Sequence, residues 1–311
     1  MRPRQPELRE GRFQAEPSGS MQRGMPELPE VETVRRGLAP VLAGARLVRV
    51  EARRPDLRFP FPDGFVQRLT GGRIERLERR AKYLLAPTDR GETLVMHLGM
   101  SGRFEITGGA AAERPGRFVL AQPPDPKHAH VVFETEAGAI VTFYDPRRFG
   151  YMDLLPSEGL QRHPWFEGLG PEPLGCGFDA AHLARAFAGR RQSVKATLLD
   201  QRVVAGLGNI YVCEALHRAG IAPETPAGAL TPRRLKALAG AVQSVLREAI
   251  EAGGSTLRDY ANADGGLGYF QHSFRVYGRE GEPCLKPGCK GRVERIVQAG
   301  RSTYACSRCQ A

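Results

Sequence analysis

Four cysteines near the C-terminus have the spacing of a metal site. Cys284, Cys289, Cys306 and Cys309 form the pattern C-x4-C-x16-C-x2-C. Thiolates bind tetrahedral Zn²⁺ strongly, and four of them leave no open position for water. The pattern therefore predicts one structural zinc ion, held by a β-hairpin that presents Arg301. The alternative, four free thiols, fits this clustering poorly.

The segment MPELPEVE (25–32) is the second stretch whose residue types could do chemistry. Composition alone favours a structural role, in which Pro29 starts a helix and the glutamates face the positive end of its dipole. Apolar residues then recur at helical spacing, which predicts a helix over 29–41. Which chemistry this segment performs depends on the other motifs in the chain.

Composition narrows the class of protein. The chain has 311 residues, a formal charge of +11 and 41% hydrophobic residues, which excludes a wholly disordered protein. No apolar run approaches the roughly 18–20 residues of a membrane span, and the first residues do not resemble a secretory signal. We expect a soluble, cytoplasmic protein that acts as a monomer. The positive charge favours an anionic partner, above all nucleic acid.

The order of sequence patterns predicts an α+β multidomain fold. Short alternating segments over 46–155 predict an antiparallel β-sandwich, flanked by the helix at 29–41. Helical patterns follow: one helix that Asp179 can cap, one from about Ser193 to Arg202, one after Gly208, and one that begins at the cap Thr231. The predicted parts are a disordered leader (1–24), a β-sandwich domain (25–155), a linker (156–177), a helical domain (178–274) and a zinc finger (275–311). Residues 107–127 read as a mobile loop within the first domain.

Several blocks fall in a characteristic order. PELPEVET after Met25 is followed by RRAKYLL (79–85), MHLGMSGRF (96–104), DPRRFG (145–150), LGPEP (169–173), GLGNIYVCEAL (206–216), GYF (268–270), VYGREGEPC (276–284) and the cysteine tail. Together they resemble the formamidopyrimidine-DNA glycosylases, bacterial enzymes that repair 8-oxoguanine. The resemblance covers the chain from Met25 to its end. It implies a helix–two-turn–helix motif around GLGNIY and damaged double-stranded DNA as partner, near the bacterial nucleoid.

The resemblance also implies a chemistry for the first block. If Met25 starts the chain and is removed, Pro26 presents a secondary amine with a pKa of roughly 8 and a useful neutral fraction. That amine would attack C1′ of the damaged nucleotide and expel the base, leaving a cationic iminium. Glu27 would protonate the sugar ring oxygen. By the same resemblance Lys82 would assist β-elimination and Arg301 would assist δ-elimination.

Other positions match family residues that contact DNA. Met100, Arg147 and Phe149 correspond to a triad inserted where the damaged base has left the stack. The positions that match phosphate contacts are His128, which we place on a strand with His130, and Arg190, Asn209 and Tyr277. Gly206 and Gly208 are expected to let backbone approach a phosphate, and the glycines around Met100 and Phe149 to mark exposed turns. Residues 253–270 resemble the loop that closes over the extruded base.

Two features of this sequence depart from the family pattern and leave alternative functions open. With residues 1–24 attached, the Pro26 nitrogen is an unreactive amide, so we predict that Met25 is the working start. Otherwise the chain would be a zinc-containing DNA-binding protein without catalysis. The C-x4-C spacing differs from the C-x2-C of many relatives, which affects only the hairpin's local shape. A glycosylase for oxidised pyrimidines is a third possibility, although Leu28 and MHLGMSG resemble the 8-oxoguanine branch.

Overall fold

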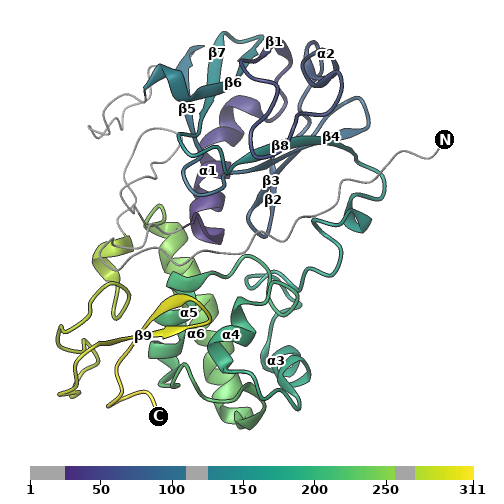
Figure 1. Cartoon of the computed structure of the whole chain (residues 1–311). Coiled ribbons are helices and arrows are strands. Elements are labelled where there is room, and N and C mark those ends of the chain that lie inside the picture. The colour runs from purple at the N-terminus through teal and green to yellow at the C-terminus, as the bar shows by residue number, and fades with distance from the viewer. Residues whose placement is uncertain (1–24, 110–124, 256–269) are drawn as a thin grey trace.

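The structure, a computed structural model, describes residues 25–109, 125–255 and 270–311. The predicted leader, most of the predicted loop at 107–127 and most of the segment at 253–270 lie outside these ranges. Figure 1 shows two halves: sheets and one long helix in the first, and a group of helices with a C-terminal hairpin in the second. No helix within the described ranges has the length and apolarity to cross a membrane.

The first half is a sandwich of two four-stranded antiparallel sheets, as predicted. One sheet has the order β1 (Leu47–Ala52), β6 (Ala129–Thr135), β7 (Ala139–Tyr144), β5 (Arg103–Gly108). The other has the order β2 (Glu78–Arg80), β3 (Tyr83–Pro87), β4 (Glu92–His97), β8 (Tyr151–Pro156). Apolar residues of both sheets, of α1 (Leu28–Leu42) and of the short α2 (Phe65–Leu69) form one core.

Helix α1 flanks the sandwich and reaches the second half (Figure 1). Its buried positions, among them Val31, Val34 and Leu38, recur at the spacing that predicted the helix. Pro29 occupies the first turn, where the missing N–H costs nothing. The helix extends one residue beyond the predicted range at each end.

The second half contains α3 (Ala180–Phe187), α4 (Val194–Leu199), α5 (Asn209–Ala219) and α6 (Pro232–Glu251). Asp179 and Thr231 cap α3 and α6 through their side chains, as predicted, and Ser193 caps α4 in the same way. Helix α4 ends before the predicted Arg202, because Asp200 accepts the Arg202 N–H and turns the chain. The hairpin of β9 (Glu294–Gln298) and β10 (Arg301–Ala305) packs against α5.

Short 3₁₀ turns join these elements at Pro126–His128, Leu160–Arg162, Ala227–Ala229 and Phe270–Ser273. The segment predicted as a linker, 156–177, packs closely on the sandwich. Phe166 is buried against Leu85 and Val95 of the second sheet, and Trp165 lies beside it. Aromatic residues therefore anchor the Gly- and Pro-rich connection at its middle.

Candidate active site

The Glu27 carboxylate lies at the N-terminus of α5, far away in the sequence. Its Oε1 accepts the Ile210 N–H at 2.9 Å, and its Oε2 lies 3.5 Å from the Tyr211 nitrogen. The Glu27 N–H in turn donates to Glu30 at 2.9 Å, at the start of α1. Glu27 is 3% exposed, and Pro26 beside it is buried. One carboxyl group thus joins the first turns of two helices from opposite halves of the molecule.

Burial changes the acidity of this carboxyl. Loss of water raises the pKa of Glu27 from 4.5 to about 7, and nearby Glu30 also raises it. Lys82 and the two α5 amides act in the opposite direction but are weaker than the burial. An acid with a pKa near neutrality can both release and accept a proton at physiological pH.

Two glycines make this contact possible. A Cβ on Gly208 would lie 2.2 Å from the Glu27 carboxyl carbon, and one on Gly206 would lie 2.8 Å from the Leu28 side chain. Gly206 also has a positive φ of 81°. Within the protein these glycines admit Glu27 and Leu28, and their approach to a phosphate stays a prediction. The anion at the end of α5 is a carboxylate of the protein itself.

Lys82 lies in the tight turn between β2 and β3 rather than within a strand. Ala81 beside it has a positive φ of 53°. Glu172, in the connecting segment 156–177, holds the turn: it accepts the Ala81 N–H at 2.6 Å and pairs with Arg79 at 2.7 Å and Arg80 at 2.9 Å. The position of Lys82 therefore depends on a carboxylate from the connecting segment.

Two of the predicted residues, Glu27 and Arg301, lie close enough to Lys82 to affect its pKa. Burial lowers the pKa of Lys82; Glu27 opposes this shift and Arg301 adds to it. Burial, with Lys82 and Arg58, lowers the pKa of His97 to about 3. Because its Nδ1 accepts the Gly99 N–H at 3.0 Å, the neutral His97 ring carries its proton on Nε2.

The hairpin that carries Arg301 is fixed by two side chains of the helical half. Lys195, which is buried on α4, donates to the Ser302 carbonyl at 3.3 Å and to the Thr303 hydroxyl at 2.5 Å. Asn209, at the first position of α5, donates to the same Ser302 carbonyl at 2.9 Å. Arg301 is thus adjacent in sequence to an anchored residue and remains exposed itself.

The predicted DNA-inserting residues lie on two turns that touch. A Cβ on Gly99, next to Met100, would lie 2.3 Å from the backbone of Phe149, so the two chains meet backbone to backbone. Buried Asp145 joins them: it accepts from the Ser101 hydroxyl at 2.5 Å and from the Gly150 N–H at 2.7 Å. The glycines themselves are buried and allow close packing, whereas Pro146, Arg148 and Phe149 on the second turn are exposed, as predicted for that turn.

The side chains on these turns differ in exposure. Phe149 is 42% exposed, and the guanidinium of Arg147 lies 5.0 Å from the centre of its ring. Met100 is half-buried. His128 ends a 3₁₀ turn instead of lying on a strand with His130, because Asp125 caps that turn; the His130 ring is buried and contacts the Asp145 carbonyl at 2.9 Å. The predicted His128–His130 alternation is therefore wrong.

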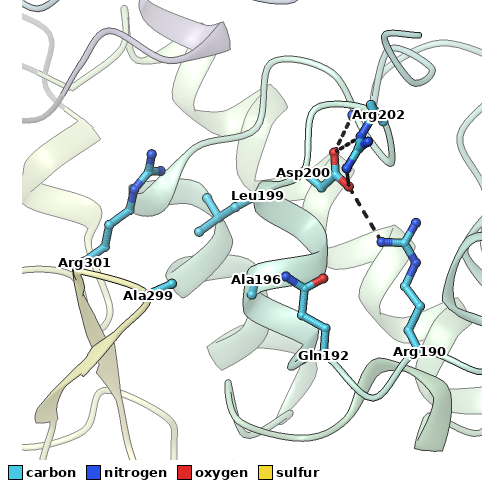
Figure 2. Close-up of a pocket in the computed structure, with 8 residues that line it drawn as sticks. All are labelled: Arg190, Gln192, Ala196, Leu199, Asp200, Arg202, Ala299 and Arg301. Carbon is cyan, nitrogen blue, oxygen red and sulfur yellow. Dashed lines mark hydrogen bonds and ion pairs between the residues drawn. The ribbon is translucent and has the colours of Figure 1, made fainter. Parts of the chain in front are cut away.

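An open pocket of about 400 Å³ lies between α4 and the hairpin, and Figure 2 shows its lining. Arg190, Arg202 and Arg301 contribute to it, and Asp200 is its one acidic side chain. Asp200 pairs with Arg202 at 3.0 Å and with Arg190 at 3.7 Å. Arg301 lies on the opposite side of the pocket from this group (Figure 2). The pocket has the charge of a site for a phosphate backbone.

Tyr277 lies under the hairpin. Its N–H donates to the buried Glu214 carboxylate at 2.9 Å, and its ring meets the Tyr304 ring edge-on at 5.0 Å. Burial raises the pKa of Tyr277, and Asn209 is among its hydrogen-bonding neighbours. The structure thus brings Tyr277, Asn209 and the Arg301 hairpin to one place.

The four predicted metal ligands form one cluster. Their sulfur atoms all lie within 4.8 Å of one another, with 3.7 Å between Cys284 and Cys309 and 3.8 Å between Cys289 and Cys306. A tetrahedron with Zn–S bonds of about 2.3 Å has edges of about 3.8 Å. The cysteines therefore fit one zinc ion, which would hold the hairpin. Four sulfur ligands would leave this ion no open coordination position.

Family models match almost the whole described chain in three consecutive parts. They are the formamidopyrimidine-DNA glycosylase N-terminal domain (residues 25–152), the helix–two-turn–helix domain of the same enzymes (169–261) and a zinc finger found in these glycosylases and in isoleucyl-tRNA synthetase (281–311). The chain belongs to the formamidopyrimidine-DNA glycosylase family. Its zinc finger is the one expected from the cysteine spacing.

Relatives and solved structures agree with this membership. The formamidopyrimidine-DNA glycosylases of Phenylobacterium zucineum and Caulobacter vibrioides are 70% and 67% identical, over 92% of this chain and all of theirs. The crystal structure of the Thermus thermophilus protein is 41% identical with a TM-score of 0.77, covering 92% of this chain and 98% of that one. A Lactococcus lactis mutant bound to Fapy-dG-containing DNA is 33% identical with a TM-score of 0.77, over 92% and 99%.

The structure places three further residues around the site that the sequence did not point to: Glu172, His97 and Lys195. Glu172 and His97 fall inside recognised blocks, but nothing in their local sequence marks a partner. Lys195 had a detectable signal: it lies between Val194 and Thr197 on the buried face of a short helix, where a lysine needs partners.

Proposed function

We propose that this chain is a bifunctional DNA glycosylase and abasic-site lyase of base excision repair that removes oxidised purines from duplex DNA. The family is one of DNA glycosylases, and this proposal adds the lyase reaction and the residues that perform it. The observation that carries it is Glu27: a carboxyl buried beside Pro26, with its pKa raised to about 7, among two cationic side chains.

Pro26 is the nucleophile in this proposal. In a chain that begins at Pro26, its secondary amine attacks C1′ and the bond to the damaged base breaks. Glu27 gives a proton to the sugar ring oxygen as the ring opens. The iminium that results carries no N–H, so it stays cationic and accepts electrons from the sugar.

Lys82 and Arg301 serve the eliminations that follow. Burial lowers the pKa of Lys82, which favours its free amine relative to that of an exposed lysine, and this amine takes the C2′ proton as the 3′ phosphate leaves. Arg301 supplies a fixed positive charge near the 5′ phosphate, which leaves in the second elimination. The Lys195 and Asn209 bonds to Ser302 support this role, because they fix the residue next to Arg301.

The DNA contacts follow from the same geometry. Phe149 and Met100, on turns joined through Asp145, would fill the space left by the extruded nucleotide, and Arg147 would face the orphaned base. The pocket that Arg190 lines has the charge to hold backbone phosphates. His128, Asn209 and Tyr277 complete the proposed phosphate contacts.

The experiment that tests the proposal is borohydride trapping on an 8-oxoguanine:cytosine duplex. Chains starting at Met25 and at Met1 are compared, with the N-terminus of each verified by intact mass. We expect a covalent adduct only with the chain whose Met25 is removed, because only there is Pro26 an amine. No adduct from that chain, with tight DNA binding retained, would refute the lyase reaction and favour a DNA-binding protein without catalysis.

The substrate class is tested separately. Single-turnover base release is measured from 8-oxoguanine and from thymine-glycol duplexes of identical flanking sequence. We expect faster release of the oxidised purine. The reverse order would assign the chain to oxidised pyrimidines while leaving the Pro26 chemistry intact.

A further inference from the structure

His217 lies in the last turn of α5 and is 1% exposed. Its Nε2 is 3.3 Å from the sulfur of Cys284, one of the four zinc ligands. We propose that His217 donates an N–H···S hydrogen bond to the zinc-bound Cys284 thiolate and is a positioning residue that fixes the zinc module on α5. This inference goes beyond the proposed function and does not depend on the lyase reaction.

The direction of the hydrogen bond follows from the chemistry of the two groups. A thiolate bound to zinc has lost its proton and can only accept, so the imidazole must carry hydrogen on Nε2. The other ring nitrogen, Nδ1, is buried and has no hydrogen-bond partner in the described part of the chain. A buried lone pair without a partner is better tolerated than a buried N–H without one. Both ends of the ring therefore favour the same tautomer.

His217 acts on the metal site from outside the ligand set. Four cysteine sulfurs already complete the tetrahedron, as their mutual distances show. Within the zinc module, Cys284 also receives the Lys286 N–H at 3.5 Å, but that donor is only two residues away. His217 is 67 residues away in sequence and belongs to another domain. Hydrogen bonds to metal ligands orient them, and their loss typically lowers metal affinity by about 10- to 100-fold.

The link matters because of what else α5 holds. The first residue of this helix, Asn209, binds the carbonyl next to Arg301, and its first amides bind Glu27. His217 is eight residues further along, about 12 Å at 1.5 Å per residue. The hairpin is thus attached to α5 at both ends: at Asn209 near its tip and at His217 beside the metal. Figure 1 shows the hairpin lying along this helix.

A second contact allows a matched control. Arg234 on α6 donates to the Gly220 carbonyl at 3.3 Å and also binds the Ala311 carbonyl, so it holds the same module without touching sulfur. Arg234→Gln therefore weakens docking alone. His217→Phe keeps the ring and removes the donor, whereas His217→Gln places an N–H at a similar distance along the side chain.

The test measures zinc release from the zinc-loaded full chain to an excess of a colorimetric chelator. We expect His217→Phe to release zinc at least tenfold faster than the unmodified protein, His217→Gln to recover most of this loss, and Arg234→Gln to remain within about threefold. Equal rates for His217→Phe and the unmodified protein would overturn the proposal. So would an equally fast release from Arg234→Gln, which would assign the effect to docking.

A measurement on the unmodified protein does not depend on variants that fold. In protein loaded with ¹¹³Cd and labelled with ¹⁵N-histidine, an N–H···S hydrogen bond transmits a scalar coupling from the metal to the imidazole proton. We expect one histidine Hε2 to show that coupling. Its absence, with the metal bound by four sulfurs, would refute the hydrogen bond.

Discussion

Replacing Glu27 by Gln separates the stability cost of this carboxyl from its chemistry. The substitution keeps the size of the side chain and one oxygen that can accept the Ile210 N–H, now 2.9 Å away. It removes the negative charge from a side chain that is 3% exposed. We therefore expect a more stable protein that is less able to release bases.

The magnitude follows from the pKa. Burial moves the pKa of Glu27 from 4.5 to about 7, and a shift of this size corresponds to roughly 3 kcal/mol at pH values above both. The glutamine amide would meet the Tyr211 N–H, 3.5 Å from the present oxygen, at a cost of about 1 kcal/mol. The net gain is about 2 kcal/mol, or a thermal midpoint higher by roughly 4–8 °C.

The pH dependence has a definite sign. Below pH 4.5 the carboxyl is protonated in both states, and it contributes no difference. Between 4.5 and about 7 the unfolded chain loses the proton and the folded chain keeps it, so the native protein loses stability as pH rises. The advantage of Glu27→Gln should therefore grow through this window and stay constant above it.

The stability assay follows thermal unfolding from pH 4 to 8. It uses the Met1-start chain, because the Pro26 nitrogen of that chain is an amide and carries no charge. The chemical assay uses the Pro26-start chain, in which we expect base release to fall at least 100-fold while trapping on a preformed abasic site persists. A pH-independent stability difference, or a less stable variant at pH 8, would refute the burial argument. If trapping fell as much as base release, the assignment of Glu27 as the acid would be refuted. Glu27 would then serve as structural support for Pro26.

Three further predictions test the surrounding structure. Gly208→Ala should displace the Glu27 carboxyl, because its carbon would lie 2.2 Å from the new Cβ. We expect this variant to lose about 1–3 kcal/mol of stability and most of its base release in a single-turnover assay. The control Gly240→Ala, with open space around it in α6, should stabilise the protein by about 0.5–1 kcal/mol. Glu172→Gln should slow strand cleavage at an abasic site by about tenfold by loosening the Lys82 turn, whereas Glu92→Gln, which breaks a separate arginine pair, should not change that rate. Removing zinc should weaken duplex binding at least tenfold in a fluorescence titration but leave the emission of Trp165 unchanged, because that residue packs in the first half.

Patterns within single elements predicted most of the fold. The helix at α1, the side-chain N-caps Asp179 and Thr231 and the alternating strands are local properties of the chain, so periodicity and capping residues were sufficient to predict them. The cysteine spacing likewise placed a zinc site correctly, because ligand geometry restricts how far apart the members of a pair can lie.

The contacts between distant segments were not predicted. Gly208 follows a pattern typical of backbone close to phosphate, yet its neighbour is a carboxylate from the other half of the chain. The glycine residues next to Met100 and Phe149 suggested exposed turns, yet they allow two backbones to touch. A glycine signals that something approaches closely, and the sequence alone does not say what.

The central groups of the site exist only when the two halves are docked. Glu27 takes its hydrogen bonds from α5, across the boundary between sandwich and helices, and the Lys82 turn takes its own from Glu172 in the connecting segment. A carboxyl that leaves α5 would regain water, and its pKa would fall toward 4.5. The acid needed for base release is therefore a property of the docked state. Separating the halves should therefore leave the Glu27 carboxyl ionised at neutral pH, without a proton to give, before either half unfolds.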